Sequence, residues 1–172
     1  MIFKKNNNNI NVNDINNNEK INYFIEKKTF GLEGIYHFIP QREPFLMVDS
    51  VLDIDIKKQK IVCEKQIRND EWYLKGHFPK NPVMPGVLIV ETMAQSSSII
   101  AKAIIKDTNE IFLLAEVEDV KFKSICKPGD KLIIEVIVEK IRSSLMVSKC
   151  VVKNQDNIII AEGRIKAFKK KI

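Results

Sequence analysis

Residues 77–95 contain the side chains of this chain that could perform acid–base chemistry. His77 supplies an imidazole, and Glu91 supplies a carboxylate within a segment that is otherwise apolar. A carboxylate in such a segment is rarely buried without a purpose or a partner. An imidazole, a carboxylate and a donor for an oxyanion are together what proton abstraction beside a carbonyl group requires. The residue types therefore predict proton transfer at a carbonyl compound.

The oxyanion donor is expected where Pro85 and Gly86 open the helix predicted to carry Glu91. Proline is tolerated there because its missing N–H would have no helical partner in any case. The free N–H groups and the positive end of the helix dipole form an anion site. Gly86 has no side chain, so a ligand carbonyl could approach its N–H closely. Gln95 lies four residues after Glu91 and shares its helix face.

Each of these residues also has an ordinary structural explanation. A single histidine more often packs than catalyses, as we expect for His37 beside Phe38. A helical glutamate usually lies at the surface, and Pro-Gly is usually a turn. Spacing alone therefore favours the structural interpretation for each residue taken separately. Their concentration within 20 residues makes the catalytic interpretation equally well supported.

The elements around this stretch indicate an α+β fold. Residues 87–106 are the one long helix candidate; they are apolar on nearly every side and rich in small residues, so the helix should be buried. A short helical turn is expected at residues 32–38. Strands are expected at residues 45–55, 60–68, 111–118, 120–125, 131–141, 145–153 and 158–168. A long, strongly bent antiparallel sheet wrapped around one central helix satisfies this order.

The composition excludes several classes of function. The chain has 172 residues, enough for one domain with a real core, and a formal net charge of +6. Its basic residues interleave with acidic ones, which favours a solvated basic surface over binding of nucleic acid. Its longest apolar runs are short and broken by charge, so we expect no membrane-spanning segment.

The N-terminal residues and the cysteines predict where the protein resides. Residues 1–23 are rich in Asn and are expected to be a disordered leader to a folded domain at residues 24–172. They lack the features of a secretory signal. Import into an organelle through this leader is a minor alternative, against which the absence of Arg and Ser argues. Three widely spaced cysteines without a CxxC pattern indicate neither a zinc site nor disulfides. We therefore expect buried free thiols and a cytoplasmic location.

The chain resembles the hotdog-fold (3R)-hydroxyacyl-acyl-carrier-protein dehydratases of type II fatty-acid synthesis, from about Ile35 to Phe168. The matching motifs are IPQREPFLMVD at residues 39–49, GHFP at 76–79, MPGVLIVE at 84–91, Ala94-Gln95, VKF at 120–122 and PGD at 128–130. GHFP and MPGVLIVE at this spacing are specific for the family. The resemblance implies a hotdog fold with five to six strands.

The resemblance also implies a reaction. His77 and Glu91 would be the catalytic pair for syn elimination of water from a (3R)-hydroxyacyl thioester, giving the trans-2-enoyl product. The thioester carbonyl would bind the Gly86 N–H, and no cofactor or metal is expected. Gln95 matches a residue that holds the glutamate.

Further expectations concern binding and assembly. Phe78 and Pro85 complete the expected substrate-binding positions. The implied partner is an acyl carrier protein that carries the 3-hydroxyacyl substrate. In the family the site spans a homodimer, with the histidine from one subunit and the glutamate from the other, and the assembly is often a trimer of dimers.

The chain departs from the family pattern at three positions outside the catalytic pair. Gln41 stands where the family usually has His, Glu43 where it has an aromatic or similar residue, and Glu116 where it has Gly. These differences indicate a divergent member, with its own acyl-chain preference or carrier.

Three alternative functions remain on this fold. A dehydratase that also isomerises the double bond usually carries Asp at the position of Glu91. A hotdog thioesterase lacks the GHFP and MPGV pair. A non-catalytic acyl-binding protein has no need to keep both His77 and Glu91, although the fold alone does not exclude it.

Overall fold

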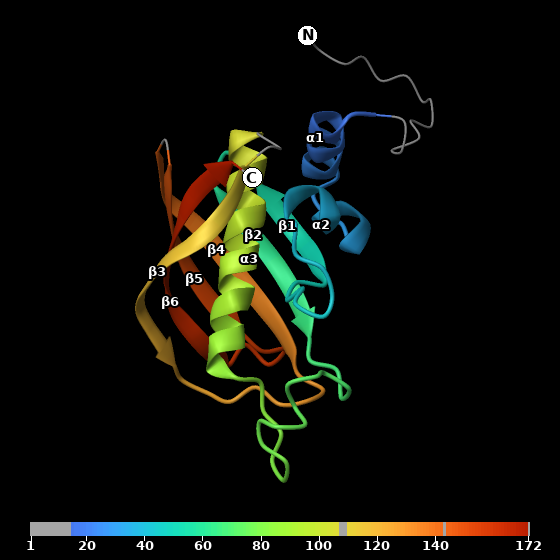
Figure 1. Ribbon diagram of the computed structural model, residues 1–172, viewed down its shortest axis with the longest axis vertical. Coiled ribbons are helices and arrows are strands. Elements are labelled where there is room, and N and C mark those ends of the chain that lie inside the picture. The colour runs from blue at the N-terminus through green and yellow to red at the C-terminus, as the bar shows by residue number, and fades with distance from the viewer. Residues whose placement is uncertain (1–14, 107–109, 143, 172) are drawn as a thin grey trace.

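The protein folds as one bent sheet around one helix (Figure 1). The computed structural model describes residues 15–106, 110–142 and 144–171. Six antiparallel strands form the sheet in the order β1-β2-β4-β5-β6-β3, which confirms the expected α+β hotdog fold. The elements are α1 (Asn17–Lys27), α2 (Leu32–Phe38), β1 (Ser50–Asp55), β2 (Lys60–Gln66), α3 (Gly86–Ile105), β3 (Glu110–Phe122), β4 (Lys131–Arg142), β5 (Leu145–Lys153) and β6 (Ile159–Lys171).

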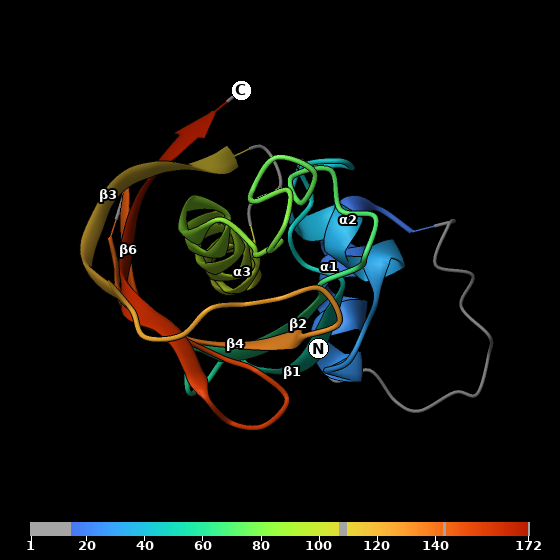
Figure 2. The same cartoon turned by 90° about the horizontal axis from the view of Figure 1, so that it is seen from below.

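The long helix α3 lies inside the curve of the sheet, while α1 and α2 cover the side of α3 opposite β3 (Figure 2). Its small residues let it approach the sheet closely, and the Oγ atoms of Ser97 on α3 and Ser148 on β5 are 2.7 Å apart. The helix ends where Lys106 adopts a left-handed conformation. The expectation that no segment could span a membrane was wrong in one respect. Helix α3 is long enough and apolar enough to cross a membrane, judged by length and composition alone. Most of α3 is nevertheless buried, as befits a core helix.

The boundary expected between a disordered leader and the folded domain is wrong. Residues 1–14 lie outside the described residues, but α1 begins at Asn17. Asn16 and Glu19 form a reciprocal capping box at its start. Ile21 and Phe24 are buried against the rest of the domain. The Asn-rich composition made this helix hard to recognise. Its N-cap is one of the asparagines, and only two apolar residues, three positions apart, pack it against the domain.

The strands expected at residues 45–55, 111–118 and 120–125 differ from those in the structure. The first was expected from residue 45, but β1 begins at Ser50, and residues 45–49 are an irregular segment. The expected strands at 111–118 and 120–125 are one strand, β3, whose register shifts between Glu118 and Lys121. The backbone of Asp119 is left-handed at this bulge. Opposite the bulge, a Cβ on Gly163 would lie 2.5 Å from Val120, so glycine is required there.

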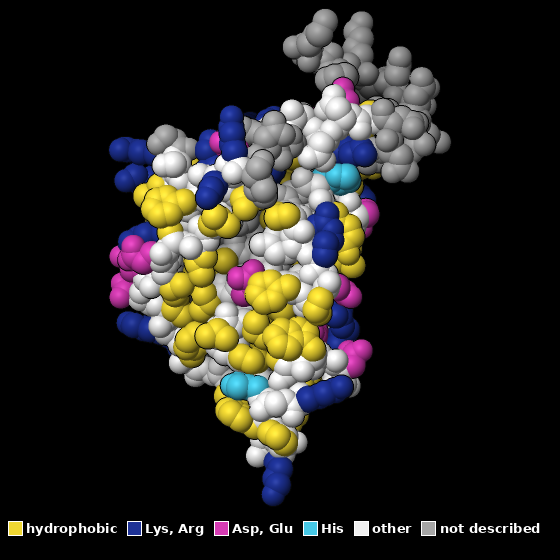
Figure 3. Space-filling model, viewed as in Figure 1, with side chains coloured by type: hydrophobic (Ala, Val, Ile, Leu, Met, Phe, Trp, Pro, Cys, Tyr) yellow, Lys and Arg dark blue, Asp and Glu magenta, His cyan; other side chains and the backbone are white. Residues whose placement is uncertain are grey.

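Strand β3 is an edge strand with an exposed apolar surface. It pairs with β6 on one side only, among the strands that the structure describes. Its exposed apolar side chains are Leu113, Leu114, Val117 and Phe122. Figure 3 shows hydrophobic side chains gathered on the face that carries β3 and the first turns of α3. Such an edge is a template for pairing with another chain unless something covers it.

Candidate active site

His77 lies in the loop between β2 and α3, where its own hydrogen bonds fix its tautomer. Its Nδ1 is 3.0 Å from the backbone oxygen of Val83, which can only accept, so Nδ1 carries the proton. The backbone N–H of Val83 donates in return to the oxygen of His77 at 2.9 Å. The ring also stacks on Phe78, across a cis peptide bond. The Nε2 atom is thereby left with a free lone pair that can accept a proton.

Glu91 lies on the second turn of α3 and is held by Gln95, as the resemblance implied. The Nε2 atom of Gln95 donates to Glu91 Oε1 at 2.8 Å and to the oxygen of Phe45 at 2.8 Å. The Oε1 atom of Gln95 accepts from the N–H of Met47 at 2.8 Å. Burial raises the pKa of Glu91, partly offset by the hydrogen bond from Gln95. The carboxyl group is therefore suited to retain a proton at higher pH than an ordinary glutamate.

The start of α3 provides unpaired backbone donors beside an aromatic ring. Pro85 is the N-cap and Gly86 the first helical residue, as predicted. Among the hydrogen bonds of the described residues, none uses the N–H of Gly86 or Val87. The ring of Phe122 packs on Gly86, where an added Cβ would lie 3.0 Å from it. Glycine thus leaves room at an anion-binding helix terminus that a larger residue would fill.

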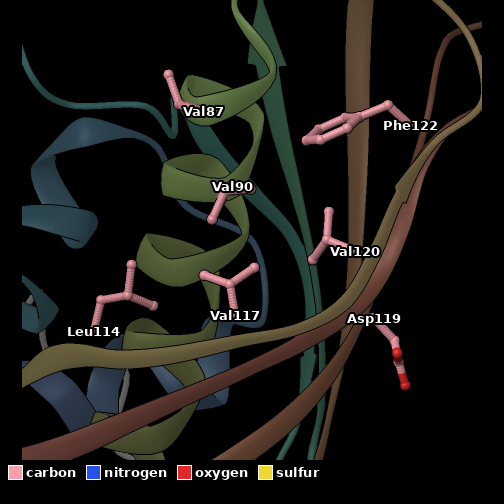
Figure 4. Close-up of a pocket in the computed structure, with 7 residues that line it drawn as sticks. All are labelled: Val87, Val90, Leu114, Val117, Asp119, Val120 and Phe122. Atoms are coloured by element: carbon pink, nitrogen blue, oxygen red, sulfur yellow. The ribbon is translucent and has the colours of Figure 1, made fainter.

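An apolar groove of about 640 Å³ runs from this terminus between α3 and β3 (Figure 4). It is lined by Val87, Val90, Leu114, Val117, Asp119, Val120 and Phe122. Val90 precedes Glu91 directly, and Val87 and Phe122 adjoin Gly86. The groove can therefore receive an apolar chain whose polar end lies at the start of α3.

The two predicted acid–base residues belong to separate networks within one chain. His77 is bonded to Val83, and Glu91 to Gln95. No hydrogen bond or ion pair joins His77 to Glu91 among the described residues. Over the same residues, no cluster of three or more His, Cys, Asp or Glu side chains is arranged to hold a metal ion.

Two of the three departures from the family pattern have ionic partners. Glu43 lies 3.6 Å from the guanidinium of Arg68, and Glu116 lies 3.1 Å from Lys166. The Oε1 atom of Gln41 is buried without a hydrogen-bond partner, and nothing in the structure explains this residue.

Sequence reasoning missed the residues that hold the site from outside. These are Val83, which fixes the imidazole, and the backbone of Phe45 and Met47, which fixes Gln95. Backbone acceptors leave no signal in residue type. The one available hint was the run of apolar residues after Pro44, which we read as part of a strand.

Residues 39–164 match the FabA-like domain. The chain belongs to the FabA-like family. Among curated relatives it is 38% identical over 126 residues to the 3-hydroxyacyl-acyl-carrier-protein dehydratase FabZ of Thermoanaerobacter sp. (strain X514), covering 73% of this chain and 88% of the relative. It is 40% identical over 133 residues to the FabZ of Ruminiclostridium cellulolyticum, covering 77% and 92%. The matched region of the FabA-like chain contains His77, Gly86, Glu91 and Gln95.

Solved structures with low sequence identity share the fold of this FabA-like protein. The dehydratase heterocomplex ApeI:P from Xenorhabdus doucetiae superposes with a TM-score of 0.69 at 14% identity, covering 80% of this chain and 91% of that one. Zebra fish thioesterase superfamily member 2 gives a TM-score of 0.60 at 16% identity, covering 81% and 98%. Dehydratases and thioesterases both occur on this fold, so the fold alone does not assign the reaction.

Proposed function

We propose that this protein dehydrates 3-hydroxyacyl groups carried by acyl carrier protein to their trans-2-enoyl products, in fatty-acid or related acyl-chain synthesis. The observation that carries the proposal is the hydrogen bond from His77 Nδ1 to the oxygen of Val83, because it leaves Nε2 as a base. The names of the FabZ relatives supply the substrate class. The three buried free cysteines accord with a cytoplasmic location.

In the proposed reaction each group has one task. The thioester oxygen accepts a hydrogen bond from the Gly86 N–H, which stabilises negative charge as it develops there. His77 Nε2 removes a proton from C2, and the electron pair of that C–H bond forms the double bond. The C3–O bond breaks, and protonated Glu91 gives its proton to the departing hydroxyl to form water. The groove between α3 and β3 holds the acyl chain.

We propose that the working unit is a homodimer in which each site takes His77 from one chain and Glu91 from the other. The absence of a bond between these residues within the described part of one chain supports this arrangement. So does the exposed apolar edge of β3, together with Val87, whose side chain is 76% exposed beside the site. A trimer of such dimers follows from the resemblance, and solution mass distinguishes the two assemblies.

The direct test follows absorbance in both directions, with hydration of a crotonyl thioester and dehydration of the corresponding 3-hydroxybutyryl thioester. We expect hydration and dehydration of both the carrier-linked substrate and a short N-acetylcysteamine analogue. Acyl carrier proteins are acidic and this chain carries +6, so docking should be steered by charge. The KM for the carrier-linked substrate should rise with salt, while that for the analogue stays constant. Absence of turnover with both substrates would refute the dehydratase assignment.

Complementation between inactive variants tests the shared site. Differently tagged His77→Ala and Glu91→Gln chains are co-expressed, and mixed dimers are isolated through both tags. Such a dimer has one site with both wild-type groups and one with neither, so activity that each parent lacks should reappear. Each variant co-expressed with a tagged copy of itself is the control. Mixed dimers as inactive as their parents would place both residues of a site in one chain.

A further inference from the structure

We infer that Lys65, clamped between Asp49 and Glu71, is a positioning residue that fixes the loop carrying His77. The effect of Lys65 on the reaction rests on the dehydration proposed above. The contacts of Lys65 are observed in the structure and do not depend on that proposal. Lys65 contacts neither His77 nor the apolar groove, so it would act only through the backbone that it holds.

Lys65 occupies a position on β2 where an apolar residue is expected. Along β2 the inward side chains are Ile61, Cys63 and Lys65, and all three are buried. The side chain of Lys65 is only 1% exposed. Replacing a buried ion pair by well-packed apolar residues is often neutral or stabilising. A lysine in the core therefore suggests a task other than stability.

The ammonium group of Lys65 is held by two carboxylates from two different segments. Its Nζ donates to Glu71 Oε1 at 2.9 Å and to Asp49 Oδ1 at 3.3 Å. The side chain of Glu71 is 5% exposed, and the guanidinium of Arg68 lies 3.7 Å from it. Arg68 is shared with two exposed carboxylates, Glu43 at 3.6 Å and Asp70 at 3.8 Å. Lys65 is therefore the closer of the two cations around Glu71. Removing Lys65 would leave Glu71 almost buried, with only the longer contact to Arg68.

Glu71 begins a short series of turns that ends at His77. The oxygen of Glu71 accepts from the N–H of Leu74 at 3.1 Å. The oxygen of Tyr73 then accepts from the N–H groups of Gly76 at 3.3 Å and His77 at 3.1 Å. The indole of Trp72 donates to the oxygen of Pro44 at 3.2 Å, which is a second attachment of the same turns. The backbone of His77 is thereby tied to β2 through Glu71 and Lys65.

Asp49 connects the same clamp to the support of Glu91. Its Oδ2 accepts from the N–H of Gln66 at 2.7 Å, which fixes the carboxylate on β2. Two residues earlier, Met47 donates to Gln95, the residue that holds Glu91. The segment of residues 44–49 is therefore a common brace, to which the loop of His77 and the carboxyl group of Glu91 are both fixed.

The test compares variants of two carboxylates that are each contacted by two cations, the buried Glu71 and the half-buried Glu135. Glu71→Gln is nearly isosteric but removes the negative charge that forms the ion pair with Lys65. Glu135→Gln is the control, because Glu135 also accepts from a lysine, Lys153, at 2.8 Å and from a second cation, Lys60, at 3.2 Å, but lies on β4 among the sheet strands. We expect Glu71→Gln to lower kcat by about tenfold to a hundredfold with little change in KM, as for a misplaced catalytic group. Glu135→Gln should keep both parameters.

A second readout reports the imidazole itself and needs no activity. The chain has two histidines, so ¹⁵N-histidine NMR resolves His77 once His37→Gln has assigned the other signal. The wild-type spectrum should show one tautomer, protonated at Nδ1 and bonded to Val83. In folded Glu71→Gln this signal should broaden or shift toward the mixture of tautomers found in a free imidazole. General destabilisation would leave it unchanged in the molecules that remain folded.

Lys65→Met removes the cation and is tested by the same kcat and NMR measurements. It should lower kcat and disturb the His77 signal more than Glu71→Gln does. If Lys65→Met does not fold, the result for Glu71→Gln decides. A folded Glu71→Gln protein with wild-type kcat and an unchanged His77 signal would overturn the positioning role. Failure of the dehydratase proposal would look different. The wild-type protein would then be inactive, while the NMR comparison would still report whether Lys65 and Glu71 hold the loop.

Discussion

His77→Ala is expected to lower kcat for dehydration by about two to four orders of magnitude, the usual contribution of a general acid–base group. Alanine removes the Nε2 base and leaves the groove and the Gly86 N–H in place, so KM should change far less. Stopped-flow or steady-state absorbance with a 3-hydroxybutyryl thioester, which is dehydrated to the crotonyl thioester, measures both parameters.

The other histidine provides the control for this loss. The Nδ1 atom of His37 lies 2.9 Å from Asn17 Oδ1, and its ring stacks on Phe24, so it joins α1 to α2. His37→Ala should reduce Tm and leave kcat close to the wild-type value. Near-wild-type turnover by folded His77→Ala would remove His77 from the mechanism.

Glu91→Gln should abolish most activity and preserve the fold. The amide is almost isosteric with the carboxyl group and can still bond to Gln95, but it has no acidic proton for the departing hydroxyl. We expect a loss of at least about a hundredfold in kcat. Glu139→Gln, at a carboxylate that accepts from Arg164 at 2.9 Å, is the surface control and should be fully active. Full activity of pure Glu91→Gln protein would exclude a proton donor at this position.

The raised pKa of Glu91 gives this variant a signature in pH as well. Protonated Glu91 is the active form, so wild-type turnover should fall as pH rises through the raised pKa. The stability of the wild-type protein should also fall as pH rises. A group whose pKa is raised in the folded state stabilises the protein fully below its unfolded-state pKa, and this stabilisation is lost as pH rises through the folded-state pKa. The Tm of Glu91→Gln relative to wild type should therefore increase across that window.

The central helix and most strands could be predicted because their patterns are strong. Residues 87–106 have no breaker and no polar face, and α3 occupies almost the same range. The turn at Pro128-Gly129-Asp130 and the alternation that follows it likewise predict strand β4 at residues 131–141, within one residue of its observed range. Helix α1 was missed because Ile21 and Phe24 are only two anchors in a run dominated by Asn.

The candidate site could be predicted in its chemical groups but not in its supports. His77, Glu91 and Gln95 stand in motifs whose spacing is visible in the sequence. The buried clamp of Lys65 is not visible. Alternation places Lys65 on the same face of β2 as Ile61 and Cys63, but no pattern in the sequence identifies the carboxylates that pair with it. Its partners Asp49 and Glu71 lie 16 residues before and 6 residues after it, and only the tertiary fold brings them together.

The brace of residues 44–49 has a consequence for how this protein tolerates mutation. Gln95 supports only the acid, and Glu71 supports only the loop of the base. The brace supports both through Met47 and Asp49, and it does so mainly with backbone groups and one carboxylate. Side chains along it can vary while the chain path is kept, whereas an insertion or deletion of a single residue there would displace both reacting groups at once. Length, more than residue identity, is what natural variation in this segment must preserve.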